Sequence, residues 1–139
     1  MCAPAESAES AAGQTRTGAP AVLIVEDEAP LRELLAELLR EEGYHVAEAA
    51  DGVEALRILE SRDPARSIRV VLLDMMLPHL DGAGVLRYLA ARGGETPPVI
   101  AMSASNERLA DARAAGAHLA LVKPLDLDQL LDTVARYCA

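Results

Sequence analysis

Five times along residues 21–139, a short apolar run is followed by a segment whose apolar residues recur at helical spacing. The first run, Ala21–Val25, is wholly apolar, as expected of a strand buried on both faces of a sheet. Leucines then recur at helical spacing after Pro30 and stop before Gly43, which predicts a helix with one apolar stripe: Leu31, Leu34, Leu35, Leu38 and Leu39. Strict alternation of this kind predicts an α/β fold in which helices cover both faces of a parallel sheet.

The remaining units follow the same rule. Further strands are expected over residues 44–49, 68–73, 98–102 and 119–122, and further helices over 51–61, 82–92, 105–115 and from 127 onward. Asp51 with Glu54, and Asp126 with Gln129, have the spacing of helix-capping pairs. Residues 1–20 are small and polar without any period, which predicts a disordered N-terminal tail ahead of one compact domain at 21–139.

Composition excludes several classes of function. With 13 basic and 22 acidic residues the net charge is −9, which argues against a nucleic-acid-binding surface and against docking on anionic lipid. Aliphatic stretches such as Val70–Leu73 are far too short to cross a membrane, and the N-terminus lacks the pattern of a signal peptide. Cys2 and Cys138 stand at opposite ends of the chain and form no disulfide framework. We therefore expect a cytoplasmic protein.

Polar residues follow four of the predicted strands directly. In doubly wound sheets the ligand site lies at the carboxyl ends of the strands. The residues expected at that edge are Glu26 and Asp27 with Glu28, then Asp74, Ser103 and Lys123. Several carboxylates, one hydroxyl and one ammonium group are thus predicted to converge.

This set of groups suits phosphoryl transfer. Crowded carboxylates repel one another, and Lys123 alone cannot neutralise Glu26, Asp27 and Asp74. A Mg²⁺ ion can, because it prefers carboxylates, waters and phosphate oxygens, and the backbone carbonyl of Met76 offers another ligand. Asp74 would act as the nucleophile toward phosphorus, while Ser103 donates a hydrogen bond to a phosphoryl oxygen.

Each of these residues also has a simpler explanation when it is taken alone. Asp27 and Ser103 can serve as helix caps, Asp74 can be an ordinary loop residue, and Lys123 can be a solvated surface residue. Because all four are predicted at the same edge of the sheet, we favour a shared site.

Together these residues resemble the bacterial response-regulator receiver domain, and the resemblance covers about 21–139. The segments that carry it are Val25–Glu28, Leu73–Gly82, Met102–Ala104, Gly116–Ala117 and Lys123–Pro124. The resemblance implies a (βα)₅ flavodoxin-like fold with strand order 2-1-3-4-5.

The resemblance also assigns roles within the site. It implies that Asp74 accepts a phosphoryl group from a phosphohistidine of a sensor histidine kinase or phosphotransfer protein. Mg²⁺ would be held by Asp27 directly, by Glu26 through water, by Asp74 and by the Met76 carbonyl. Lys123 would bind the phosphoryl group, and Ser103 would turn toward it.

Further residues would flank the phosphoryl site. Ala104 would leave the route to Asp74 open, Met76 and Ser105 would influence how water reaches the aspartyl phosphate, and the Lys123–Pro124 bond would be cis. The sequence departs from the family at Ala120, where an aromatic residue is usual. His118 is expected on the same strand face, and an exposed structural role is favoured for it over a substitute for the ring. This departure affects the expected transmission of the signal and not the chemistry at Asp74, since that aromatic ring makes no bond to phosphate.

The expected function is a stand-alone phosphoacceptor switch, because the sequence stops at Ala139, after the fifth helix. Its output would pass to a downstream protein effector, with the chain as a monomer or a phosphorylation-dependent dimer. It would phosphorylate and dephosphorylate itself slowly without being an enzyme in the usual sense. One alternative is a degenerate receiver that acts without phosphorylation. Another is a phosphohydrolase or phosphotransferase with an Asp nucleophile, although residues Glu26–Ala29 lack its usual pair of Asp residues.

Overall fold

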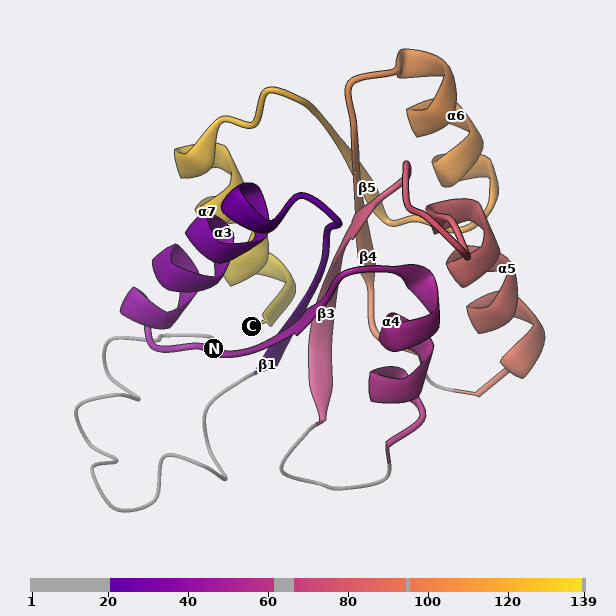
Figure 1. The fold of residues 1–139 in the computed structure, drawn as a ribbon, viewed down its shortest axis with the longest axis horizontal. Helices are drawn as coiled ribbons and strands as arrows, with labels where there is room; N and C mark the ends of the chain where they lie inside the picture. Colours follow the sequence, from indigo (N-terminus) through magenta and orange to yellow (C-terminus); the bar gives the residue numbers. More distant parts are fainter. Residues whose placement is uncertain (1–20, 62–66, 95, 139) are drawn as a thin grey trace.

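The computed structural model describes residues 21–61, 67–94 and 96–138. Five parallel strands form one sheet in the order β2-β1-β3-β4-β5, as Figure 1 shows. The strands are β1 (Ala21–Val25), β2 (His45–Ala49), β3 (Ile68–Asp74), β4 (Val99–Ser103) and β5 (Leu119–Val122). The (βα)₅ fold and its strand order are thereby confirmed. The tail expected at residues 1–20 lies outside the described residues.

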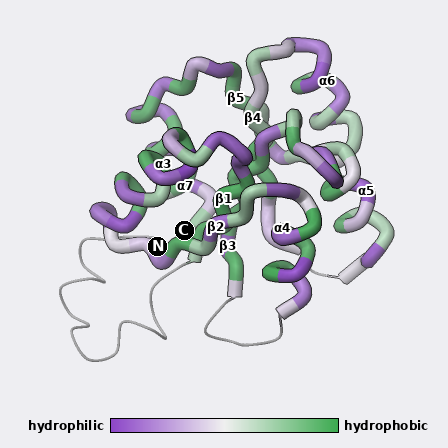
Figure 2. Tube along the Cα trace, viewed as in Figure 1, coloured by the Kyte–Doolittle hydropathy of each residue, from purple (hydrophilic) through white to green (hydrophobic). Residues whose placement is uncertain are grey.

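Five helices complete the repeating units and cover both faces of the sheet (Figure 1). They are α3 (Ala29–Glu41), α4 (Gly52–Leu59), α5 (Gly82–Arg92), α6 (Asn106–Ala114) and α7 (Leu127–Cys138). One apolar cluster joins α3 and α7 to one face of the sheet, and a second joins α4, α5 and α6 to the other. The strands at the centre of the sheet lie between these clusters, and β1 and β3 carry mostly the hydrophobic colour in Figure 2. The central strands are therefore buried on both sides, as their continuous apolar sequences require.

The apolar stripe of the first helix is narrower than its leucine spacing predicts. Leu35 and Leu39 are fully buried together with Ala36, whereas Leu34 is 42% exposed. Leu31 and Leu38 are half-buried, so the stripe is most deeply buried at its centre. Its edge remains open to solvent, as is ordinary for a surface helix.

Element ends shift by one or two residues where hydrogen bonding decides them. β3 extends to Asp74, which pairs with Met102, and β4 extends to Ser103, which pairs with Val122. Pro98 has no N–H, so β4 begins at Val99, although the Pro98 carbonyl still accepts from Val71 N at 3.0 Å. These extensions bring two polar residues into the ladder itself. Among the described residues, no helix is long and apolar enough to cross a membrane.

Candidate functional site

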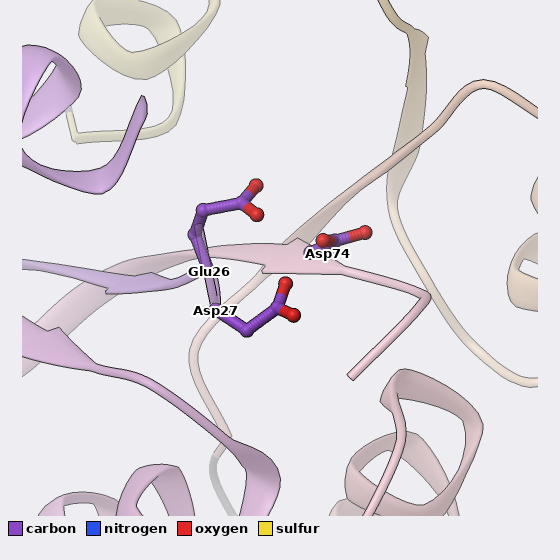
Figure 3. Close-up of side chains that lie close together, drawn as sticks. All are labelled: Glu26, Asp27 and Asp74. Atoms are coloured by element: carbon purple, nitrogen blue, oxygen red, sulfur yellow. The ribbon is translucent and has the colours of Figure 1, made fainter. Parts of the chain in front are cut away.

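Three carboxylates meet at the carboxyl edge of the sheet. Glu26 and Asp27 follow β1, and Asp74 ends β3, the neighbouring strand on the side where the strand order reverses. Each offers an oxygen that lies within 4.8 Å of the others, and Figure 3 shows the Asp27 and Asp74 side chains turned toward each other. Glu26 and Asp74 are buried, whereas Asp27 is exposed. The cluster is therefore open to solvent through Asp27.

Lys123 supplies positive charge to this cluster from the end of β5. Its Nζ donates to Glu26 Oε1 at 2.7 Å and to Asp74 Oδ2 at 3.3 Å. Its backbone is held by β4, because Lys123 N donates to Ser103 O at 2.9 Å. The Lys123–Pro124 peptide bond is cis. One ammonium group thus bridges two of the three carboxylates.

Burial dominates the electrostatics of the cluster. Desolvation raises the pKa of Glu26 from 4.5 to about 7, and the nearby Asp74 charge adds to this effect, while the hydrogen bond from Lys123 opposes it. For Lys123, burial alone would lower the pKa, but the hydrogen bond to Glu26 and the charges of both carboxylates outweigh it and raise the pKa. Burial therefore disfavours the charge on Glu26, while the two carboxylates favour the charge on Lys123.

Backbone groups orient the two buried carboxylates. Met76 N donates to Asp74 Oδ1 at 3.0 Å, and Glu28 N donates to Glu26 Oε2 at 3.2 Å. The peptide of Met75 is fixed in turn, since Met75 N donates to Met102 O at 3.0 Å. The loop that leaves β3 therefore holds Asp74 at one oxygen and leaves Oδ2 beside Lys123.

The serines after β4 have different places. Ser103 is buried, and its Oγ accepts from Ser105 N at 3.1 Å. Ser105, not Ser103, caps α6, because its Oγ accepts from Arg108 N at 3.2 Å. The simpler explanation of Ser103 as a helix cap is therefore wrong. Ala104 between them is exposed, as is the Met76 side chain on the β3–α5 loop.

Arg32 is a site neighbour that our sequence reasoning missed. It lies on the first turn of α3, where its Nη1 donates to Glu26 O at 2.9 Å and its Nε to Glu48 Oε1 at 3.3 Å. It thereby ties the chain that carries Glu26 and Asp27 to β2. An arginine two residues after a helix-starting proline carries no local signal for such a contact.

Comparison with known proteins places this arrangement in a family. The sequence profile described as the response regulator receiver domain matches residues 22–135, which is most of the chain. The chain belongs to the response regulator receiver family. A receiver domain is the phosphoacceptor switch of a two-component system, so this is the general role of the chain.

Individual relatives agree with this assignment. The receiver domain is 39% identical over 116 residues to the transcriptional regulatory protein PdtaR of Mycobacterium tuberculosis, covering 81% of this chain and 54% of the relative. It is 36% identical over 118 residues to sporulation initiation phosphotransferase F of Bacillus subtilis, covering 84% and 91%. The solved receiver domain of Francisella response regulator 1452 superimposes with a TM-score of 0.76 at 30% identity, covering 86% of this chain and 96% of the other. The chain thus spans about half the length of PdtaR but most of the phosphotransferase.

The acidic cluster of this receiver domain has the donors that Mg²⁺ prefers. All three side chains offer hard carboxylate oxygens, and their negative charge exceeds what Lys123 supplies. Asp27 is exposed and so can keep bound waters in contact with the ion, as Mg²⁺ usually requires. The residues present therefore fit the ion.

The departure at Ala120 leaves a hollow on the α6–β5–α7 side. A cavity of about 420 Å³ is lined there by residues that include Leu109, Ala120, Val122 and Gln129. Val122 is 54% exposed. His118 is exposed at the opposite end of β5, where its Nδ1 accepts from Val99 N at 3.3 Å and its ring meets Tyr137 edge-on. The exposed structural role expected of His118 agrees with these contacts.

Proposed function

We propose that this receiver domain accepts a phosphoryl group on Asp74 and signals through the resulting change of conformation. The observation that carries the proposal is the position of Asp74. It is buried at the end of β3 with Lys123 Nζ 3.3 Å away and two more carboxylates within 4.8 Å. A nucleophilic carboxylate beside a fixed cation and a hard-ion site is what in-line phosphoryl transfer requires.

In the proposed step, an Asp74 oxygen attacks the phosphorus of a phosphohistidine on a kinase or phosphotransfer protein. The P–N bond breaks, its electron pair goes to the imidazole nitrogen, and that nitrogen takes up a proton. Lys123 would neutralise charge on the phosphoryl oxygens, and Ser103 would turn its hydroxyl to donate to one of them. Ala104, Met76 and Ser105 would control access of water to the product.

The proposed metal site uses Asp27, Asp74 and the Met76 carbonyl as ligands, with Glu26 acting through water. Mg²⁺, when bound, supplies positive charge that offsets the developing charge on the phosphoryl oxygens. Asp27 is exposed, whereas Glu26 is buried and makes the shorter of the two Lys123 contacts, 2.7 Å against 3.3 Å to Asp74. These differences support direct contact by Asp27 and an indirect role for Glu26.

The proposed partners are a sensor histidine kinase or phosphotransfer protein on the input side and a protein effector on the output side. The net charge of −9 argues against nucleic acid as the direct target. We infer a cytoplasmic protein that is a monomer or a phosphorylation-dependent dimer. Gel filtration with and without phosphodonor tests the oligomeric state, and a shift only with donor supports the dimer.

The test is the intact mass of the protein after incubation with Mg²⁺ and acetyl phosphate. The wild type should gain one phosphoryl group, Asp74→Asn should gain none, and the surface variant Asp126→Asn should behave as the wild type. A phosphorylated histidine kinase is the second donor. Absence of the mass gain with both donors would refute the proposal and favour a receiver that acts without phosphorylation.

A further inference from the structure

A hydrogen bond joins the loop after Asp74 to the start of α4. His79 Nδ1 lies 2.8 Å from Asp51 Oδ2, although the two residues are 28 positions apart in the sequence. Beside it, Gly52 N donates to Leu80 O at 3.1 Å. Two bonds therefore connect the β2–α4 turn to the far half of the β3–α5 loop.

The loop adopts an unfavourable backbone conformation at this contact. His79 has a φ of 67°, which is rare for residues other than glycine, and Leu80 N donates to Pro78 O at 2.8 Å across it. Such a conformation persists only where the surroundings impose it. The bonds to Asp51 and Gly52 are the contacts that do so here.

The fit around Gly52 shows how closely the two segments approach. A Cβ atom at Gly52 would lie 2.2 Å from Leu80 O and 2.9 Å from Leu80 C. Both are backbone atoms, so the loop would have to move to admit a side chain. The loop is thus seated directly on the first turn of α4.

Asp51 divides its carboxylate between two tasks. Oδ1 accepts from Glu54 N at 2.9 Å and caps α4, while Oδ2 binds His79. The hydrogen bond from Glu54 and then the one from His79 lower the pKa of Asp51. The residue that begins α4 is therefore charged and oriented toward the loop.

The first residues of the β3–α5 loop contact Asp74, the proposed phosphoacceptor. Met76 N donates to Asp74 Oδ1, and the Met76 carbonyl is the backbone ligand expected for Mg²⁺. Only Leu77 and Pro78 separate Met76 from His79. Movement of the loop at His79 will therefore move the Met76 peptide against Asp74.

We propose that Asp51 and His79 are positioning residues that hold the β3–α5 loop in the conformation which aims Asp74 for phosphoryl transfer. This proposal rests on the proposed function. Neither residue touches the reacting atoms; both act through the Met76 peptide. Their contribution is the gain in rate and in metal affinity that follows from a fixed loop.

Three substitutions distinguish the effect of the His79–Asp51 hydrogen bond from the effects of the positive φ at His79 and of the cap on α4. His79→Gly removes the imidazole but permits the positive φ. His79→Asn keeps a nitrogen donor at the place of Nδ1 without positive charge. Asp51→Ser keeps a cap for α4 and loses the partner of His79. Asp126→Ser is the matched control, since Asp126 Oδ1 caps α7 through Gln129 N at 3.1 Å.

Two measurements are made on each full-length protein. One is the rate constant for phosphorylation at saturating acetyl phosphate, and the other is the Mg²⁺ concentration at half-maximal thermal stabilisation. We expect His79→Gly and Asp51→Ser each to lower the rate about three- to fivefold, the range of one solvent-exposed polar contact, and to raise the Mg²⁺ midpoint by a similar factor. His79→Asn should recover most of the loss. The double variant should be no worse than either single one, and Asp126→Ser should match the wild type.

The outcomes distinguish this proposal from the proposed function. If the wild type is phosphorylated and His79→Gly equals it in rate and Mg²⁺ midpoint, the positioning role is refuted while the proposed function stands. Additive losses in the double variant would also refute it, because they would show that the two residues act separately. If the wild type takes no phosphoryl group, the proposed function fails, and the Mg²⁺ midpoints of the wild type and the variants then test whether Asp51 and His79 hold the loop. Equal midpoints would refute the positioning role too.

Discussion

Glu26→Gln should make the metal-free protein more stable at pH 8. The wild-type side chain is fully buried, and its pKa is raised from 4.5 to about 7. At about 1.4 kcal/mol for each tenfold change in proton affinity, this corresponds to about 3 kcal/mol against the ionised folded state. Glutamine keeps the shape of the side chain and one oxygen that can accept from Lys123, but its NH2 group replaces the oxygen that accepts from Glu28 N, so that hydrogen bond is lost. We therefore expect the substitution to recover about 1–2 kcal/mol of unfolding free energy, the difference between the two effects.

The sign of the pH dependence follows from linkage. Because the folded-state pKa lies above the unfolded value, the folded protein binds the extra proton between pH 4.5 and 7. The cost of the Glu26 charge is therefore nearly absent below pH 4.5, grows through this window and is complete above pH 7. The advantage of Glu26→Gln should follow the same course.

Urea unfolding monitored by far-UV circular dichroism measures this, since the chain has no Trp for a fluorescence signal. Experiments are run from pH 5 to 8.5 in the presence of a chelator. Glu48→Gln is the control, because Glu48 is a partly exposed glutamate that also pairs with arginines. A difference between wild type and Glu26→Gln that is independent of pH, or a variant less stable at pH 8, would refute the reasoning.

Three further perturbations have defined outcomes. We expect Mg²⁺ to raise the melting temperature of the wild type. Asp27→Asn should weaken this increase, because it removes the exposed carboxylate of the cluster. An unchanged response to Mg²⁺ would exclude Asp27 as a ligand. Gly82→Ala should lower the melting temperature and slow phosphorylation, since the added Cβ would lie 2.7 Å from Met75 Cα and 2.8 Å from Asp74 O. Wild-type behaviour in both assays would contradict this close packing. Ala120→Val should raise the free energy of unfolding by up to about 1 kcal/mol, because the larger side chain partly fills the hollow beside Leu109. The phosphorylation rate should not change. A loss of stability would show that the hollow cannot admit the methyl groups.

The edge on which the site lies could be predicted from the sequence because four of the five apolar runs end where they meet a polar residue. Glu26, Asp74, Ser103 and Lys123 all follow this rule, and parallel strands bring such ends together. The structure adds the distances within this group and the choice of Glu26 and Asp74 as the partners of Lys123. Those details depend on strand register and rotamers, which local spacing does not encode.

Contacts between distant segments of the chain could not be predicted from local sequence patterns. Asp51 was predicted as a helix cap, and it is one, but nothing near it in sequence indicates that its second oxygen binds His79. Arg32 likewise reaches Glu26 and Glu48 from a helix whose leucines drew the prediction. In both cases an ordinary polar residue acquires its contact from the packing of a neighbouring unit. Such partners can be found only when the fold is known.

The charge arrangement and the loop geometry together indicate that the site is held in an unfavourable state by the rest of the fold. Two buried carboxylates share one lysine, a third carboxylate lies within 4.8 Å, and His79 holds a positive φ five residues beyond Asp74. Clusters of apolar residues on both faces of the sheet supply the stability that maintains these features. Met76 N donates to Asp74 Oδ1 at one end of this loop, and His79 binds Asp51 at the other, so the loop contacts both Asp74 and the residue that caps α4. On the proposed function, a phosphoryl group at Asp74 would therefore act on a loop that is already strained and that reaches α4.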